Sequence, residues 1–235
     1  YWIYFELFKI VNNLNTIMKN NRNLKLIKTI DGSHSIINNI NDEIYHSRFG
    51  AVQESQHIFI NNGIKICKKN DVKILEIGLG TGLNLILTYM NSKKKYIEYH
   101  AIEPYPLPIE IIEKINYKKI LNIDVLDKIH LSSFNKKNVF RSNFIFYKYE
   151  TKFQDFFSKK KFDIIYFDAF SPRTQPEMWM VSNFKKSFSL LKENGFLVTF
   201  CAKGEVKRRL KEVGFNLNHP PGPFGKREIT LAYKS

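Results

Sequence analysis

One stretch of the chain decides how it folds: Val72-Lys73-Ile74-Leu75-Glu76-Ile77-Gly78-Leu79-Gly80-Thr81-Gly82-Leu83-Asn84. Its apolar first half predicts a buried strand, and the three glycines on alternate positions predict a sharp bend into a helix. Glycines at such a bend let a ligand approach the main chain, because no Cβ stands in the way. A dinucleotide-binding fingerprint would need its third glycine where Leu83 stands, so the turn does not predict a pyrophosphate site.

Strand–helix alternation continues from this turn and predicts an α/β fold, a mostly parallel sheet with helices on both faces. We expect strands at 72–78, 97–103, 143–149, 162–168 and 195–201, and helices at 51–60, 82–91, 107–118, 177–192 and 205–213. Residues 119–142 carry turn signals and predict an irregular connection. The segment 215–234 predicts a C-terminal antiparallel hairpin whose arms are joined by the Pro- and Gly-rich stretch 220–225.

Three carboxylates stand at or near the ends of these strands. Glu76 lies two residues before the first glycine, Glu103 ends the second strand, and Asp168 ends the fourth. Ligands of open α/β sheets bind beyond the carboxyl ends of the strands, so these acids should share a crevice. We expect Glu76 to meet a cationic amino group, Glu103 to accept both hydroxyls of a ribose, and Asp168 to orient an amine. The competing interpretations are a surface glutamate at Glu103 and a turn cap at Asp168.

The chain is strongly basic, with a formal net charge of +15 from 37 Lys and Arg against 22 Asp and Glu. Such a charge predicts an anionic partner such as nucleic acid. However, 30 of the basic residues are Lys, and the chain also holds 29 Ile and 23 Asn, an enrichment that an AT-rich coding sequence produces whatever the function. The charge therefore supports RNA binding only mildly.

Missing patterns argue against several function classes. Cys67 and Cys201 form no disulfide or metal pattern and the histidines form no ligand cluster, so we expect a reduced, cytoplasmic protein without a metal. No apolar run reaches the length of a membrane span. The G-x-S-x-G elbow of serine hydrolases and the P-loop of NTPases are both missing from the sequence.

The glycine turn resembles motif I of class I S-adenosylmethionine-dependent methyltransferases, whose cofactor carries an α-amino group and a ribose but no phosphate. Further motifs, in their order and spacing, resemble the methyltransferase domain of the MnmC/MnmD family, which completes 5-methylaminomethyl-2-thiouridine at the tRNA wobble position. They run from Asp31 to Tyr233 and comprise Asp31-Gly32-Ser33, Tyr45-His46-Ser47, Gly50-Ala51, Glu54-Ser55, Ile102-Glu103-Pro104-Tyr105-Pro106-Leu107, Phe167-Asp168-Ala169-Phe170-Ser171-Pro172, Pro176-Glu177-Met178-Trp179, Thr199-Phe200-Cys201-Ala202-Lys203-Gly204, Lys207-Arg208-Arg209-Leu210, Gly214-Phe215 and Gly225-Lys226-Arg227-Glu228.

This resemblance implies a class I, Rossmann-like fold, S-adenosyl-L-methionine as cofactor and tRNA as partner. The cofactor-binding residues it implies, together with the strand-end acids, are Glu76, Gly78, Gly80, Thr81, Gly82, Asn84, Glu103, Glu150 and Asp168. The expected substrate contacts are Tyr45, His46, Phe170, Pro172, Lys203, Lys226 and Arg227. The last three lie in C-terminal loops and are expected to meet phosphates, with a solvated basic face as the competing interpretation. Glu150 would meet the adenine amino group although the usual Gly-Asp is absent there, and Asp155, on an expected following helix, competes for that role.

The resemblance also divides the chain. Residues 1–23 are expected to be an extension outside the domain, 24–64 an N-terminal appendage, and 65–235 the methyltransferase domain. The range 1–17 precedes Met18 and lacks the basic leader and cleavage site of a signal peptide, so we expect an upstream extension of the gene or a loosely docked helix. Some family members carry a second, FAD-dependent domain. No second glycine fingerprint follows residue 204, so oxidative activity is not expected here.

The implied acceptor sets the chemistry. A primary aminomethyl group is mostly protonated at neutral pH, and an ammonium has no lone pair with which to attack. The site must therefore provide the neutral amine and hold it roughly 3 Å from the sulfonium methyl. Asp168 is the expected catalytic residue, which accepts the amine hydrogen bond and helps to remove its proton. Phe170 and Tyr45 would hold the flipped base.

Two other functions fit the same residues. An aminopropyltransferase or a small-molecule N-methyltransferase would share the glycine turn, the ribose acid and the aspartate of the fourth strand. A catalytically silent RNA-binding module would keep the fold, but the intact Glu76, Glu103 and three glycines speak against decay of a cofactor site.

Overall fold

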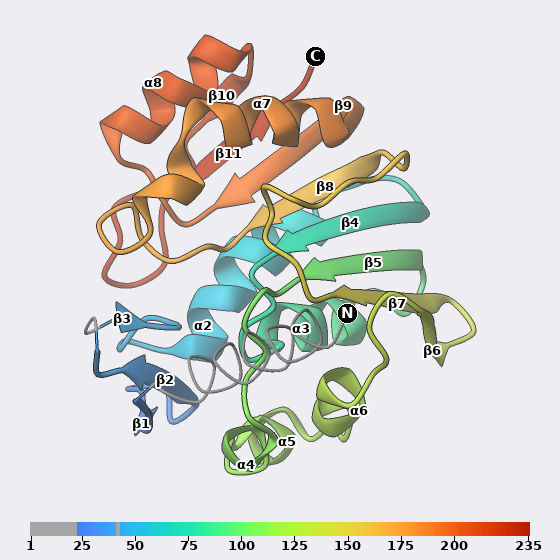
Figure 1. The fold of residues 1–235 in the computed structure, drawn as a ribbon, viewed down its shortest axis with the longest axis vertical. Helices are drawn as coiled ribbons and strands as arrows, with labels where there is room; N and C mark the ends of the chain where they lie inside the picture. Colours follow the sequence, from blue (N-terminus) through green and yellow to red (C-terminus); the bar gives the residue numbers. More distant parts are fainter. Residues whose placement is uncertain (1–22, 41–42) are drawn as a thin grey trace, which may run out of the picture.

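The computed structural model describes residues 23–40 and 43–235. The expectation for residues 1–17 falls outside this described part. An eight-stranded sheet runs through the molecule in the order β10-β11-β9-β8-β4-β5-β7-β6 (Figure 1). Its strands are β4 (Asp71–Ile77), β5 (Tyr96–Ile102), β6 (Lys137–Arg141), β7 (Phe144–Tyr149), β8 (Phe162–Phe167), β9 (Leu191–Thr199), β10 (Asn216–Asn218) and β11 (Thr230–Tyr233).

The sheet is parallel in its centre and antiparallel at both sides. Strands β9, β8, β4, β5 and β7 are parallel neighbours, whereas β6 pairs antiparallel with β7, and β11 pairs antiparallel with both β9 and β10. The predicted fold class and the C-terminal hairpin are therefore confirmed. The chain leaves β4 toward β5 and later returns to β8 on the other side of β4. This change of direction opens a crevice at the carboxyl ends of β4 and β8.

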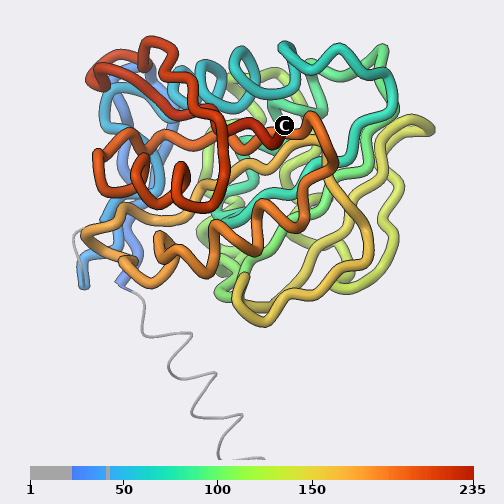
Figure 2. Tube along the Cα trace, turned by 90° about the horizontal axis from the view of Figure 1, so that it is seen from above, coloured from blue at the N-terminus to red at the C-terminus, as the bar shows by residue number. Residues whose placement is uncertain are grey.

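Helices cover both faces of the sheet, as Figure 2 shows for the cyan and orange segments. One face packs on η1 (Gln56–Ile64, a π-helix) and α3 (Leu83–Asn91). The other face packs on η2 (Pro176–Trp179), α7 (Val181–Leu190) and α8 (Gly204–Val213). Alternate side chains of β4 enter the two cores, because successive residues of a strand point to opposite faces.

The N-terminal segment forms a small sheet that the sequence did not predict. Strands β1 (Leu24–Lys28), β2 (His34–Asn38) and β3 (Glu43–Ile44) are antiparallel, and α2 (Ala51–Ser55) follows and runs directly into η1. The predicted helix at 51–60 is thus present but extends to Ile64. Figure 1 shows the small sheet on the side toward which the arrowheads of β4 and β5 point. It therefore borders the crevice.

The predicted helix at 107–118 is wrong. The structure has two short helices there, α4 (Ile109–Ile112) and α5 (Tyr117–Leu121). Asn116 lies between them, where its side chain accepts a hydrogen bond from His34 N–H at 2.8 Å and donates one to Gly32 O at 2.9 Å. The small sheet thus docks on Asn116, which would lie in the interior of the helix if 107–118 were one continuous helix.

The predicted helix at 177–192 is also wrong in its bounds. It is broken at Met180, whose backbone is extended (ψ 152°), and β9 begins at Leu191 rather than at residue 195. The Asn183 side chain donates hydrogen bonds to the carbonyls of Glu177 and Met178, which stabilises the end of η2. Helix α6 (Leu126–His130) and strand β6 lie within the range 119–142, for which only an irregular connection was expected.

Candidate active site

The glycine turn after β4 has the backbone that its sequence requires. Gly78, Gly80 and Gly82 have φ angles of 92°, 49° and 77°, in the region that side chains disfavour. A Cβ on Gly78 would lie 2.5 Å from the carbonyl oxygen of Asp168, so the turn also needs glycine for space. Gly78 N–H donates to Ile102 O at 3.0 Å, which joins the ends of β4 and β5.

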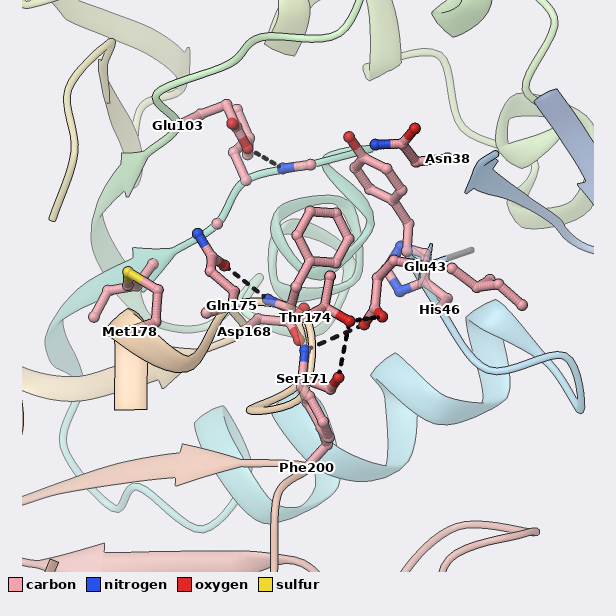
Figure 3. Close-up of a pocket in the computed structure, with 18 of the residues that line it drawn as sticks. Asn38, Glu43, His46, Glu103, Asp168, Ser171, Thr174, Gln175, Met178 and Phe200 are labelled. Atoms are coloured by element: carbon pink, nitrogen blue, oxygen red, sulfur yellow. Dashed lines mark hydrogen bonds between the residues drawn. The ribbon is translucent and has the colours of Figure 1, made fainter. Parts of the chain in front are cut away.

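Glu103 is held directly against this turn (Figure 3). Its carboxylate accepts a hydrogen bond from Gly80 N–H at 2.9 Å and another from Tyr105 N–H at 2.9 Å. Each carboxylate oxygen can accept a further hydrogen bond. Glu103 also lines the cavity, where its carboxylate is fixed by these two hydrogen bonds; its ribose role stays a prediction.

Two further acids share one amide. Asn84, in the first turn of α3, donates to Glu76 Oε1 at 3.0 Å and to Asp168 Oδ2 at 2.7 Å. Burial, with the nearby Asp168 charge, raises the pKa of Glu76 well above its usual value. Burial also raises the pKa of Asp168 to about 7, and Glu54 adds to this rise, whereas Asn84 and Lys226 oppose it. Asp168 can thus change its protonation state near neutral pH.

The crevice is a cavity of about 1510 Å³. Pockets for one drug-sized ligand are roughly 300–1,000 Å³, so this cavity has room for a cofactor and a second ligand. The cofactor-site predictions that line it are Gly78, Gly80, Glu103 and Asp168. The others from the glycine-turn region, which are Glu76, Thr81, Gly82 and Asn84, are buried behind its wall. These four residues shape the site rather than present their side chains to its surface.

The residues present fit a cofactor with a cationic amino group and a ribose. Gly78 and Gly80 line the cavity without a Cβ, so a ligand can approach their backbone. Glu103 and Asp168 line the same cavity with carboxyl groups that can accept hydrogen bonds from hydroxyls or from an amino group. The glycine turn and these two acids make this part of the cavity suitable for S-adenosylmethionine.

Aromatic residues from two distant segments also line the cavity, and the Tyr45 ring lies against the glycine turn, 3.2 Å from the position of a Cβ on Gly80. The Tyr45 and Phe170 rings meet edge to face, with centroids 5.0 Å apart. Trp179 Nε1–H donates to Phe170 O at 2.8 Å, and Phe170 N–H donates to Gln175 Oε1 at 3.2 Å. The loop after β8 is thereby fixed, and Phe170 lines the cavity.

Glu43 fixes the same loop from the small sheet (Figure 3). Its carboxylate accepts a hydrogen bond from Ser171 N–H at 3.2 Å and another from the Thr174 hydroxyl. Sequence reasoning missed this residue, because a strand as short as β3 has no periodic pattern to mark it.

His46 links the small sheet to the glycine turn. Its Nε2 shares a hydrogen bond with Thr81 Oγ1 at 2.9 Å, and burial lowers its pKa to about 4. The imidazole is therefore neutral at neutral pH. His46 lines the cavity and also holds the glycine turn; its contact with a substrate stays a prediction.

Lys226 has contacts that differ from those of a phosphate-binding side chain. Its Nζ lies 3.3 Å from Glu54 Oε1 and 4.4 Å from the centroid of the Phe200 ring. Glu54 Oε2 in turn accepts a hydrogen bond from Ser47 N–H at 2.7 Å. Lys226 therefore joins the C-terminal loop to the N-terminal segment at the cavity wall. Sequence reasoning included Glu54 in a family motif but gave it no role in the site.

Four further predicted residues, away from the glycine turn, also lie outside the described cavity lining. Pro172 is buried, so it offers no stacking surface to a base in the cavity, and Lys203 and Arg227 are exposed elsewhere. Glu150 is exposed, whereas the competing Asp155 does line the cavity. Asp155 lies in a turn rather than on the helix that we expected, because the described chain forms no helix between β7 and β8. Asp155 is thus the better placed acid for an adenine.

Two searches of the described residues complete the description of the site. No group of three or more His, Cys, Asp and Glu side chains in that part of the chain is arranged to hold a metal ion. Within the same residues, no helix has the length and apolarity needed to cross a membrane.

The sheet order is that of the class I S-adenosylmethionine-dependent methyltransferase fold. Residues 95–235 match the family described as S-adenosyl-L-methionine-dependent methyltransferase, and the chain belongs to that family. The resemblance to the methyltransferase part of MnmC is confirmed by relatives and by a solved structure. S-adenosylmethionine is accordingly the cofactor of the family to which this chain belongs.

Three relatives illustrate the similarity. An uncharacterized protein of Methanocaldococcus jannaschii is 26% identical over 89% of this chain and 59% of its own length. The tRNA 5-methylaminomethyl-2-thiouridine biosynthesis bifunctional protein MnmC of Leptospira interrogans is 30% identical over 81% of this chain and 32% of its own length. The crystal structure of MnmC2 from Aquifex aeolicus, at 22% identity, superposes with a TM-score of 0.69 and covers 90% of this chain and 70% of that one. The chain thus spans only part of the curated relatives that it matches.

Proposed function

We propose that the protein transfers a methyl group from S-adenosylmethionine to the exocyclic amine of 5-aminomethyl-(2-thio)uridine at the tRNA wobble position. One observation carries the proposal: the Asp168 carboxylate lines the same cavity as the glycine turn and the Tyr45–Phe170 pair. The MnmC-named relatives support the choice of acceptor. The basic net charge of +15 is compatible with tRNA, and a tRNA acceptor implies that the protein works in the cytoplasm.

Asp168 is the residue that would manage the acceptor's proton. Bound S-adenosylmethionine supplies an electrophilic methyl group on a positive sulfonium. A carboxyl group whose pKa is about 7 is well matched to accept a proton from an ammonium near neutral pH. Asn84 holds Asp168 Oδ2 at 2.7 Å, so the carboxylate is oriented before the acceptor arrives. This orientation serves the alignment that methyl transfer needs.

The aromatic pair would position the base. Tyr45 and Phe170 are rings in the lining of the cavity, and unpaired bases bind proteins by stacking on such side chains. Glu43 and Gln175 hold the backbone around Phe170, so the ring is presented in a fixed position. In this proposal, Tyr45 and Phe170 recognise the base, and Asp168 at the end of β8 accepts the proton.

The test is mass spectrometry of nucleosides from tRNA incubated with the protein and methyl-labelled cofactor. The tRNA should come from cells that lack the final methylation, so that aminomethyluridine is available. We expect one labelled methyl group on that nucleoside, formed far more slowly at pH 7 by Asp168→Asn. Polyamines and small amines serve as alternative acceptors. Label in those compounds but not in tRNA would overturn the proposal in favour of a small-molecule N-methyltransferase.

Two controls separate the remaining alternatives. Decarboxylated S-adenosylmethionine with putrescine tests for an aminopropyltransferase, which would form spermidine. Calorimetry with S-adenosylmethionine tests for a silent RNA-binding module, which would bind tRNA and release no heat with the cofactor.

A further inference from the structure

An exposed pair of phenylalanines lies beside the cavity. The Phe49 and Phe224 rings meet edge to face at 81°, with centroids 5.0 Å apart. They are 40% and 70% exposed, although such large apolar rings are normally buried. Phe49 also lines the cavity, so the pair lies at its edge. We call Phe49 and Phe224 the aromatic rim.

The aromatic rim is preformed by two segments that are distant in sequence. Phe49 lies between β3 and α2, and Phe224 lies in the loop between β10 and β11, beside the N-terminal segment in Figures 1 and 2. Gly225 has a φ of 86°, and a Cβ there would overlap the Phe49 ring, so glycine allows the loop to close on it. His57 Nε2 bonds Pro221 O at 2.8 Å, which fixes the same two segments together.

Positive charge accompanies the aromatic rim. Arg48 precedes Phe49, is exposed and lines the cavity, and Arg227 is exposed on the same loop as Phe224. Guanidinium groups next to exposed rings suit a nucleic acid strand, because the rings stack bases while the cations neutralise phosphates. The same arrangement does not suit an apolar protein partner, since interface cores are depleted of charge.

We propose that the aromatic rim stacks an unpaired RNA base adjacent to the one that enters the cavity. A base that leaves its stack exposes the face of its neighbour, and an aromatic ring at the cavity edge can cover that face. Only an unpaired loop presents such a base, so the aromatic rim would favour loop RNA over duplex RNA. The identity of the loop as a tRNA anticodon rests on the proposed function, whereas the preference for unpaired RNA does not.

The test compares RNA affinities without using catalysis. Fluorescence anisotropy at fixed salt gives the dissociation constants of a labelled anticodon stem–loop and of a duplex RNA of equal length. Phe224→Ala should weaken stem–loop binding roughly 5- to 150-fold, the range for the loss of one base stack, and should change duplex binding less than about twofold. Phe224→Trp should retain the stem–loop affinity, because it keeps a stacking surface.

Phe157→Ala is the matched control. Phe157 is 81% exposed but lies in the turn region between β7 and β8 and is not in the described cavity lining, so its loss should leave both affinities unchanged. Phe49→Ala provides a second variant of the aromatic rim, and circular dichroism checks that each variant is folded.

The possible results separate this inference from the proposed function. Selective loss of stem–loop affinity in Phe224→Ala, restored in Phe224→Trp, supports base stacking even if tRNA is not methylated. Equal losses for stem–loop and duplex, or unchanged affinity in both rim variants, would overturn the inference even if methylation occurs. A wild-type protein that binds duplex as tightly as stem–loop would overturn it as well.

Discussion

The two ends of the cavity are built in different ways. At the glycine-turn end, Gly80 and Glu103 are hydrogen-bonded partners 23 residues apart, joined through one strand–helix–strand unit. At the acceptor end, the part of the cavity wall formed by the N-terminal segment, the loop after β8 and the C-terminal loop, Glu43 accepts a hydrogen bond from Ser171, which is 128 residues away. Lys226 forms an ion pair with Glu54, which is also distant in sequence. The first end is thus set by local structure and the second by tertiary assembly. We therefore expect changes at the first end to affect cofactor affinity, and changes at the second to affect turnover with the acceptor.

Asp168→Asn should give the largest effect, because Asp168 lies where the two ends meet. Asparagine keeps the size of the side chain but cannot take a proton. Turnover at pH 7 should fall roughly 10²- to 10⁴-fold, the typical loss for a general base. The loss should shrink at higher pH, where the amine is neutral without help. Single-turnover methylation of tRNA from pH 6 to 9 measures it.

The same role for Asp168 predicts how the activity of the wild-type protein depends on pH. Because the pKa of Asp168 is about 7, the proton-accepting carboxylate becomes more populated as pH rises through that value, so activity should rise over the same range. A variant with weak cofactor binding and no recovery at high pH would assign Asp168 to cofactor orientation instead.

Gly78→Ala tests how rigid the glycine-turn end is. The new Cβ would lie 2.5 Å from a backbone oxygen at a φ of 92°, so both strain and overlap destabilise the variant. The free energy of unfolding should fall by about 2–5 kcal/mol, combining the costs of an unfavourable φ and of overpacking. Gly32→Ala is the control, because Gly32 has a φ of 84° but no described atom within 4 Å of its Cβ. Equal losses in the two variants of a urea titration would show that the contact with Asp168 contributes nothing.

Glu103→Ala should separate the two ends. Loss of a charge-assisted acceptor should weaken S-adenosylmethionine binding by roughly 1–3 kcal/mol, measured by calorimetry. Glu43→Gln, at the acceptor end, should leave that affinity unchanged while it lowers turnover with tRNA. If Glu43→Gln weakens the cofactor complex as much as Glu103→Ala does, the cavity does not have two independent ends.

The Glu54–Lys226 pair should give the smallest effect, with opposite signs for its two members. Lys226 lowers the pKa of Asp168 and Glu54 raises it. Lys226→Met should therefore reduce the fraction of Asp168 that is ionised at pH 6 and slow turnover. Glu54→Gln should increase that fraction and speed turnover. Each change should be less than about fivefold, as expected for a partly screened charge. Changes of the same sign in both variants would indicate lost packing at the cavity wall rather than electrostatics.

The fold was predictable where one local rule decided the structure. The run from Val72 to Asn84 gave β4, the turn and the start of α3, because buried strand residues, alternate glycines and a helical pattern all agree there. The helix expected at 107–118 failed because Asn116 serves the small sheet through contacts that are more than 80 residues apart in sequence. No local pattern contains that information.

The site was predictable to a similar degree. Gly78, Gly80, Glu103 and Asp168 line the cavity because strand ends determine where such residues lie. Pro172 and Glu150 do not line it, since their positions depend on how irregular loops fold. Lys226 was expected to meet phosphate because it is basic and lies in a C-terminal loop. Its actual partner, Glu54, lies 172 residues earlier in the chain, and no local pattern connects the two.

The contacts of Glu43 have a consequence for synthesis on the ribosome. The small sheet leaves the ribosome before β8 has been translated, yet Glu43 bonds Ser171 and Thr174, and His34 bonds Asn116. Contacts between residues so far apart in sequence form slowly, because a long loop must close first. The small sheet must therefore wait for the loop after β8 before it can make these contacts. A nascent chain stalled before residue 171 should leave the small sheet sensitive to protease.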